Sequence, residues 1–268
     1  MTGVQTCALP ISVTIGGATQ VDPLHFLNAK ANYDVAKLAL VGGNTRAGTA
    51  VVIHKEARAR LLDPSGPPAI MGALAAVRTG MQSTMWGAEY LGWNAKWVLG
   101  YPTAKALVLG LEREEIDMTS LGDVRDVQRL AATGNFEVLS QSGYVRDGKM
   151  LSRDEFGGPL LSDLIGDKIK EPVAQRAFVY WKSIIQVGEF VALPPATPPS
   201  ILETYRTAFR ATIADPEFAA KLVATGDEFL PQSADELTAL LATLGSTPPE
   251  ALAYLRAISK RQGLSLGD

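Results

Sequence analysis

The sequence predicts an α/β protein whose sheets are mostly parallel and doubly wound. Short apolar runs and amphipathic segments alternate from Pro68 to Leu139, with short connections between them. Such alternation is typical of a parallel sheet with right-handed crossovers and helices on its faces. The runs are continuously apolar, as expected for strands that are covered on both faces. With 268 residues, 47% of them hydrophobic and 20% charged, the composition is that of a globular protein.

The middle of the chain carries the clearest elements. Leu107, Val108 and Leu111 recur at helical spacing. Gly134 stands where a glycine commonly follows the end of a helix. Strands are expected at Pro68–Met71, Lys96–Leu99, Glu115–Met118 and Phe136–Leu139, and helices at Met81–Leu91, Ala104–Leu111 and Asp123–Ala132.

The flanking segments add further strands and helices. Before the alternating stretch, β-branched runs predict strands at Val13–Ile15, Leu38–Val41 and Thr49–Ile53, and Asp22-Pro23 marks a helix start. After it, we expect a long loop at Val145–Gly166, a helix at Pro172–Trp181 and a strand within Ile184–Leu193. The last third is helical, with a capping box at Ser233–Glu236 and pairs of N-cap and proline at Thr197-Pro198, Asp215-Pro216 and Thr247-Pro248.

A candidate binding site follows from this arrangement. In a doubly wound sheet, ligands bind in the crevice outside the carboxyl ends of the strands. Three predicted connections leave that edge for helix N-termini, where free N–H groups and the helix dipole favour an anion. The candidate ligand-binding residues are Gly72, Ala73, Arg78, Thr79, Gly80, Gly100, Tyr101, Pro102, Thr103, Thr119 and Ser120. Because these donors suit a carboxylate, the sequence predicts a binding site without catalytic residues.

Each of these candidates also has an ordinary structural explanation. A Thr or Ser before a helix commonly serves only as an N-cap. Gly72 and Gly100 then serve as turn glycines, Tyr101 packs as an aromatic ring, and Arg78 is a solvated charge. Because the three connections lie at the same edge of the sheet, a shared binding site explains them better than these separate structural roles.

Several classes of function lack a signature. The chain has no P-loop, no G-x-S-x-G and no H-E-x-x-H motif. One cysteine and two histidines predict neither a disulfide nor a metal site, and we expect no cofactor. The net charge of −3 and the lack of a basic cluster argue against nucleic acid, and no apolar run is long enough for direct membrane insertion. The acidic residues Glu112, Glu114, Glu115 and Asp117 are interpreted as a solvated helix end.

The N-terminal segment Met1–Ser12 stands apart from the rest. It has neither the cationic start nor the apolar core of a signal peptide, and it resembles the translation of a common sequencing adapter. We interpret it as an artefactual, unstructured segment, with a genuine N-terminus as the alternative. In the first interpretation Cys7 is not natural, the natural reading frame starts further upstream, and an export signal is missing from this chain.

Several motifs, in order, resemble a known family. The stretch Trp97–Asp117 resembles the strand, Gly-Tyr-x-Gly loop and Leu-Glu-Arg-Gly-Glu-Val-Asp helix end of the substrate-binding receptors of tripartite tricarboxylate transporters, often called Bug-type receptors. Phe190–Pro198 resembles their Pro-Pro-Gly-Thr-Pro return segment. Their C-terminal helices are matched by Tyr205–Phe209, Ala214–Phe218 and Thr247–Glu250.

The resemblance implies a periplasmic binding protein fold of type II, with two lobes that capture a small organic di- or tricarboxylate by hinge closure. It implies a periplasmic location and membrane permease subunits as partners. The ligand crevice is then at Gly72–Gly80 and Gly100–Thr103. The expected lobes are a partial first lobe, residues 13–44 and 181–268, and a second lobe, residues 45–180.

The chain departs from the family pattern in ways that affect the site. Thr103 stands where the family usually has a glycine, which puts a side chain where the backbone normally approaches the ligand. Glu114 and Ala196 also replace common glycines, and the family's first strands are not present. With the first lobe incomplete, we expect weak binding, self-association, and faster hydrogen exchange in the first lobe than in the second.

Two other functions stay open at this stage. The same receptor fold can present its ligand to a membrane sensor kinase instead of a permease, which a neighbouring gene would reveal. An enzyme on the same lobes would use the acidic cluster or Tyr101, and turnover of a bound acid would reveal it.

Overall fold

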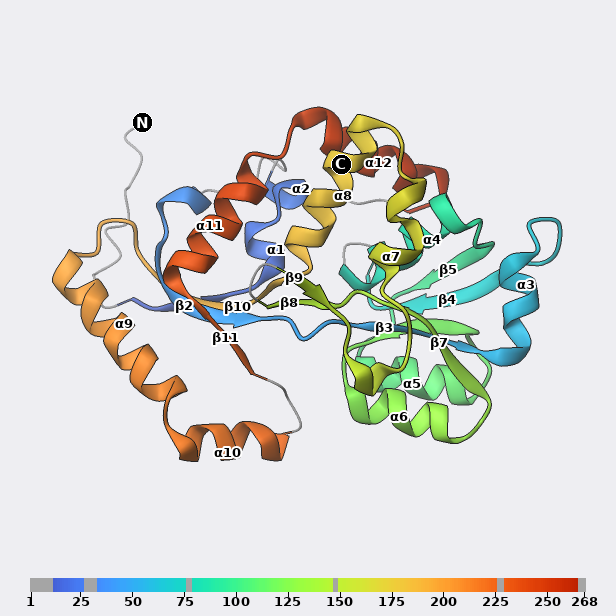
Figure 1. Ribbon diagram of the computed structural model, residues 1–268, viewed down its shortest axis with the longest axis horizontal. Coiled ribbons are helices and arrows are strands. Elements are labelled where there is room, and N and C mark those ends of the chain that lie inside the picture. Colours follow the sequence, from blue (N-terminus) through green and yellow to red (C-terminus); the bar gives the residue numbers. More distant parts are fainter. Residues whose placement is uncertain (1–11, 27–32, 76–78, 147–148, 226–228, 265–268) are drawn as a thin grey trace. The chain divides into compact units, whose positions relative to one another are not determined.

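The computed structural model describes residues 12–26, 33–75, 79–146, 149–225 and 229–264 (Figure 1). The chain divides into two compact units, each with its own sheet. The smaller unit comprises Met1–Arg46 and Val187–Ser246, and the larger comprises Ala47–Gln186 and Thr247–Asp268. The prediction that Met1–Ser12 lacks packing falls outside the described residues, except at Ser12, which is exposed.

The larger unit is built on a five-stranded sheet in the order β5-β4-β6-β3-β7. Its strands are β3 (Ala50–His54), β4 (Ala69–Ala73), β5 (Ala95–Leu99), β6 (Met118–Leu121) and β7 (Phe136–Gln141). β4 pairs in parallel with β5 and β6, whereas β3 runs antiparallel between β6 and β7. The four strands of the alternating stretch therefore point the same way, as predicted, and their carboxyl ends share one edge.

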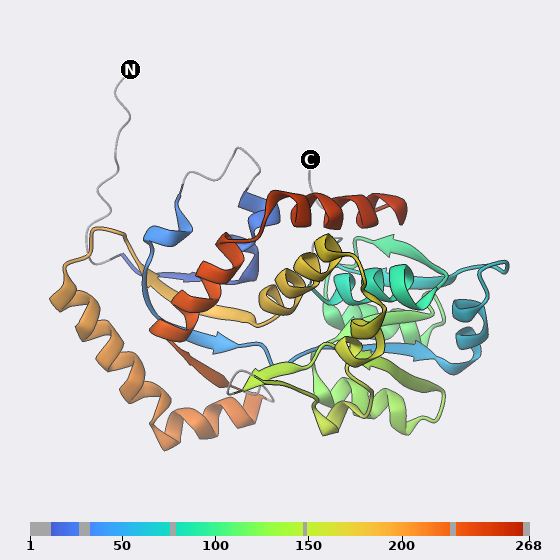
Figure 2. The same ribbon diagram turned by 45° about the horizontal axis from the view of Figure 1, so that its top comes forward.

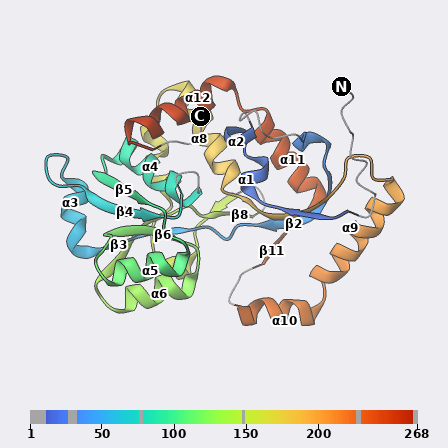
Figure 3. The same cartoon turned by 180° about the vertical axis from the view of Figure 1, so that it is seen from behind.

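Helices lie on both sides of this sheet. In the described residues, the helices of the larger unit are α3 (Arg58–Leu62), α4 (Thr79–Leu91), α5 (Ala104–Glu112), α6 (Val124–Ala132), α7 (Leu161–Ile165), α8 (Pro172–Ile184) and α12 (Pro249–Arg261). α5 and α6 enclose a core on the face that carries Ala50 and Val52 (Figures 1 and 3). α4 packs against β3 and β6 on the opposite face, where the Thr84 hydroxyl lies 3.8 Å from the Met71 sulfur.

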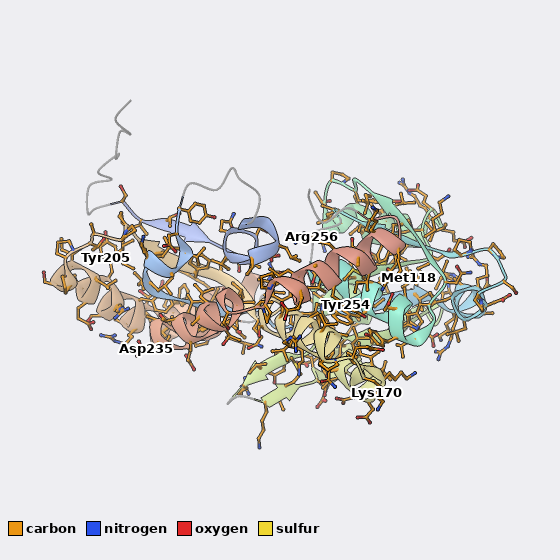
Figure 4. All side chains as sticks on the ribbon, turned by 90° about the horizontal axis from the view of Figure 1, so that it is seen from above. Met118, Lys170, Tyr205, Asp235, Tyr254 and Arg256 are labelled. Atoms are coloured by element: carbon orange, nitrogen blue, oxygen red, sulfur yellow. The ribbon has the colours of Figure 1, made fainter. Side chains whose placement is uncertain are left out.

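The last helix belongs to the larger unit, which corrects the expectation that residues 181–268 all join the first lobe. α12 packs against α8 and α4 (Figure 2). The hydroxyls of Tyr254 on α12 and Tyr90 on α4 are 2.6 Å apart. Figure 4 labels Tyr254 and Arg256 along this helix. Contacts between aromatic residues far apart in the sequence assign α12 to the larger unit, and hydrophobic periodicity cannot predict such contacts.

The smaller unit has a four-stranded sheet in the order β1-β10-β2-β11. Its strands are β1 (Thr14–Gly16), β2 (Ala39–Thr45), β10 (Val187–Leu193) and β11 (Leu230–Ser233). All three described pairings are antiparallel, so the expectation of a mostly parallel sheet is wrong for this unit. The chain leaves the unit after β2 and returns as β10, and these two strands run in opposite directions beside each other.

In the part of this unit that the structure describes, the α-helices are α1 (Ala18–Val21), α2 (Pro23–Phe26), α9 (Pro199–Ile213), α10 (Pro216–Thr225) and α11 (Ala234–Gly245). α9 and α11 pack against β2. The predicted capping box is confirmed, because the Ser233 Oγ accepts from the Glu236 N–H at 3.2 Å and the Ser233 N–H donates to the Glu236 carboxylate at 2.8 Å. In α9 and α12, however, Pro198 and Pro248 are the N-cap residues, so the helices begin one residue later than predicted.

The expected long loop at Val145–Gly166 contains regular structure. β8 (Tyr144–Arg146) and β9 (Lys149–Leu151) pair as an antiparallel ribbon, and α7 follows. These elements have three to five residues, too few for a hydrophobic period to show. Among the described helices, none is long and apolar enough to span a membrane.

Candidate ligand-binding site

The connections that leave β4 and β5 start side by side at the carboxyl edge of the larger sheet. Ala73 is in register with Leu99, and the Tyr101 N–H donates to the Ala73 carbonyl at 3.3 Å. Gly100 has a φ of +97°, in the left-handed region that favours glycine. The loop Gly100–Thr103 therefore turns directly from β5 into α5, where the sequence placed it.

Thr103 and Tyr101 have defined structural roles in this loop. The Thr103 Oγ1 accepts from the Ala106 N–H at 3.1 Å, so Thr103 is the N-cap of α5. The Tyr101 ring packs partly against the α5 core, and a Cβ at Gly110 would lie 3.1 Å from its hydroxyl oxygen. Burial raises the pKa of Tyr101, and the charge of Glu115 raises it further, which keeps the phenol a neutral donor. Pro102 and Thr103 are exposed at the edge.

Gly72 and Ala73 lie inside β4, not in the connection after it, which corrects the predicted strand end. Both are buried. A Cβ at Gly72 would lie 2.4 Å from the Ile116 Cδ1 and 3.2 Å from the Leu107 Cδ2. The glycine therefore allows α5 and the segment after it to approach the sheet, because any side chain would overpack this core.

Thr119 and Ser120 also lie inside a strand. We expected a strand at Glu115–Met118, but β6 begins at Met118, because the N–H groups of Glu115 and Ile116 both donate to the Gly110 carbonyl at the end of α5. Thr119 is fully buried, and its hydroxyl donates to the Gly72 carbonyl at 2.8 Å. Thr119 thus links β6 to β4, and the connection at this point of the edge is Gly122-Asp123.

The remaining candidates are Thr79, Gly80 and Arg78. Thr79 and Gly80 are the first residues of α4, at the N-terminus that the sequence placed on this edge. Arg78 lies outside the described residues.

The three helix N-termini at this edge differ in charge. α6 is capped by Asp123, whose carboxylate accepts from the Arg125 N–H at 2.9 Å. The side-chain hydrogen bond from Arg125 holds the pKa of Asp123 below its usual range, so the carboxylate is ionised at neutral pH. α5 has the neutral cap Thr103, and the first turn of α4 carries no acidic residue. The N-termini of α4 and α5 therefore keep their positive dipole ends, whereas a carboxylate already occupies that of α6.

The acidic residues at the end of α5 differ in exposure. Glu112, the last residue of α5, pairs with Arg129, and Glu112, Glu114 and Glu115 are exposed, as interpreted for a solvated helix end. Asp117 is only partly exposed instead, pairs with Arg60 and accepts from the Ile70 N–H at 2.7 Å. In the part of the chain that the structure describes, no three His, Cys, Asp or Glu side chains are placed to hold a metal ion.

Sequence reasoning missed the polar residues on the α4 side of the sheet. Gln82 and Ser83 on α4 and Ser140 on β7 are almost completely buried. For Gln82 and Ser83, the signal that could have found them is the run of three polar residues Gln82-Ser83-Thr84, flanked by Met81 and Met85. Such a run is unusual where a helix is covered on most sides.

The chain matches no protein-family model and no curated protein sequence. Its similarity is to solved structures. A TctC solute-binding protein from Polaromonas has 13% identity and a TM-score of 0.62, and the match covers 93% of this chain and 77% of that one. Rpa4515 of R. palustris, solved with adipate, has 16% identity and a TM-score of 0.59, covering 94% and 78%. MatC from Rhodopseudomonas palustris, solved with malate, has 14% identity and a TM-score of 0.53, covering 92% and 78%.

These matches cover nearly the whole chain. Because their sequence identity is low, they show the fold of the chain alone. The chain has the type II periplasmic binding protein fold of the TctC-type solute-binding proteins, the fold that its resemblance to tripartite tricarboxylate transporter receptors implied.

Proposed function

We propose that this chain is a solute receptor that captures a small organic di- or tricarboxylate without covalent chemistry. The observation that carries the proposal is the pair of N-termini of α4 and α5 at the carboxyl edge of the larger sheet. Neither has an acidic residue in its first turn. A helix N-terminus of this kind binds a carboxylate through its free N–H groups and its dipole.

The solved structures of the same fold support this ligand class. Rpa4515 was solved with adipate and MatC with malate, and both ligands are dicarboxylates. The output of capture is delivery to membrane permease subunits, in keeping with the transport role of solute-binding proteins. By the same comparison, we expect the protein to act in the periplasm.

Calorimetry against a panel of small molecules tests the ligand class. We expect heat of binding with one or more di- or tricarboxylic acids and none with neutral sugars, measured at ligand concentrations up to millimolar. The physical reason is that helix N-termini without an acidic residue in their first turn stabilise a negative charge and gain little from an uncharged sugar. A receptor that bound only neutral sugars, or that consumed an acid catalytically, would contradict the proposal.

A further inference from the structure

Several buried polar atoms of the larger unit have no hydrogen-bond partner among the described residues. Besides the indole N–H groups of Trp86, Trp97 and Trp181, they include both polar atoms of the Gln82 amide and the hydroxyls of Ser83, Ser120 and Ser140. Gln82 and Ser83 are each 1% exposed, and Ser140 is 0% exposed. Buried polar groups almost always have partners, and an unsatisfied one destabilises the fold, so these groups call for an explanation.

The two strand serines share one face of the sheet. Ser120 on β6 and Ser140 on β7 are both in register with Val51 on β3, which lies between them. Residues in register across strands project to the same face. The neighbours of Val51, Ala50 and Val52, face the core under α5 and α6. Because successive residues alternate, Val51 and both serines face the side on which α4 packs.

These residues also lie at the same end of the sheet. Ser120 and Ser140 each stand one residue before the end of their strands, at the carboxyl edge. α4 connects the parallel strands β4 and β5, so it starts at that edge, and Gln82 and Ser83 are in its first turns. The two serines therefore lie at the carboxyl edge on the face that α4 covers, and Gln82 lies in the first turns of that helix, which starts at the same edge.

We propose that Gln82, Ser120 and Ser140 line a second ligand subsite, closed in this conformation, between the first turn of α4 and the carboxyl ends of β6 and β7. The subsite rests on the proposed function and deepens it. An amide and hydroxyls carry no charge, so they fit a neutral hydrogen-bonding group, such as the alcohol of a hydroxy acid, better than a second carboxylate. In the closed conformation the side chains of Gln82, Ser120 and Ser140 lack hydrogen-bond partners. The hydroxyl of an entering hydroxy acid would supply these partners. Binding of a hydroxy acid would therefore shift the population toward a conformation in which the subsite is open.

Two acids that differ by one hydroxyl test this subsite. Calorimetry would measure the dissociation constants of L-malate and succinate for the unchanged chain and for Gln82→Met and Ser140→Ala. We expect the unchanged chain to prefer L-malate by about tenfold, the effect of one hydrogen bond to a neutral group. Each substitution should reduce that preference toward equality, and Ser140→Ala should leave succinate binding unchanged.

Thermal unfolding without added acid gives a second measurement that separates a ligand subsite from a structural role. Both substitutions should leave the melting temperature unchanged or raise it, because they remove an unsatisfied polar group. Gln175→Met is the matched control, since the Gln175 amide donates to the Ile169 carbonyl at 3.0 Å. It should lower the melting temperature and leave the preference for L-malate intact.

Three results would overturn the subsite. Equal binding of both acids by the unchanged chain would remove the hydroxyl preference while leaving the proposed function intact. A preference that survives in Gln82→Met and Ser140→Ala, with a lowered melting temperature, would assign these residues a structural role. Failure of the unchanged chain to bind any acid of the panel would overturn both the subsite and the proposed function.

Discussion

Replacing Trp86 with alanine is expected to lower the free energy of unfolding by about 3–5 kcal/mol, the usual loss for a fully buried large aromatic side chain. Trp86 is 0% exposed. Its ring lies 5.0 Å from that of Phe178 on α8 and 5.6 Å from that of Tyr90 on α4, measured between centroids. The loss should be large because helices α4, α8 and α12 converge on this ring. Urea denaturation, followed by tryptophan fluorescence and circular dichroism, measures the change.

Val179→Ala is the matched control for this loss. Val179 lies on α8 next to Phe178, but it is 49% exposed. Its truncation should change the free energy of unfolding by no more than about 0.5 kcal/mol. If Trp86→Ala were as mild as the control, the aromatic cluster would not hold α12 and α4 together.

Replacing Thr103 with aspartate is expected to weaken binding of a dicarboxylate by at least about tenfold. The new carboxylate would stand at the N-terminus of α5, where Thr103 now accepts from the Ala106 N–H. Two like charges about 6 Å apart, at an effective dielectric constant of about 40, repel by ~1.4 kcal/mol, which is a factor of about ten in affinity. The N-terminus of α6 already has such a carboxylate, because Asp123 is its N-cap.

The fold should tolerate this change. Aspartate is as good an N-cap as threonine, and its charge suits the helix dipole, so the melting temperature should stay the same or rise slightly. Thr103→Asn supplies the neutral control of the same shape, and its affinity for the acid should remain close to that of the unchanged chain. Equal weakening by Asn and Asp would show that shape, not charge, matters at this position.

The sequence predicted the alternating stretch well because its signals are local. Continuous apolar runs and helical spacing set β4, β5 and β7 and the helices between them within one or two residues. The start of β6 shifted by three residues, because the end of α5 captures the N–H groups of Glu115 and Ile116. The propensity of these residues alone does not reveal that competition.

What the sequence could not predict depends on contacts between distant segments. The antiparallel β3 enters the sheet between β6 and β7, and α12 joins the larger unit through Tyr254. At the candidate site, the loop Gly100–Thr103 follows from turn and cap chemistry. The role of Gly72, by contrast, depends on Ile116, which lies more than forty positions away in the chain and packs directly over it. The charge difference between α5 and α6 was readable, since Asp123 and Thr103 precede their helices in the sequence.

We expect a carboxylate to bind at the N-termini of α4 and α5, and a nuclear magnetic resonance titration tests this most directly. Amide chemical shifts would be followed while succinate is added to the isotope-labelled chain, a method that also detects weak binding. The largest changes should occur in the N–H groups of Gly100, Tyr101 and Thr103–Ala106 and of Thr79–Gln82, with little change at Val124–Asp126 in the first turn of α6. The largest changes in the first turn of α6, or no changes along this edge at saturating succinate, would contradict it.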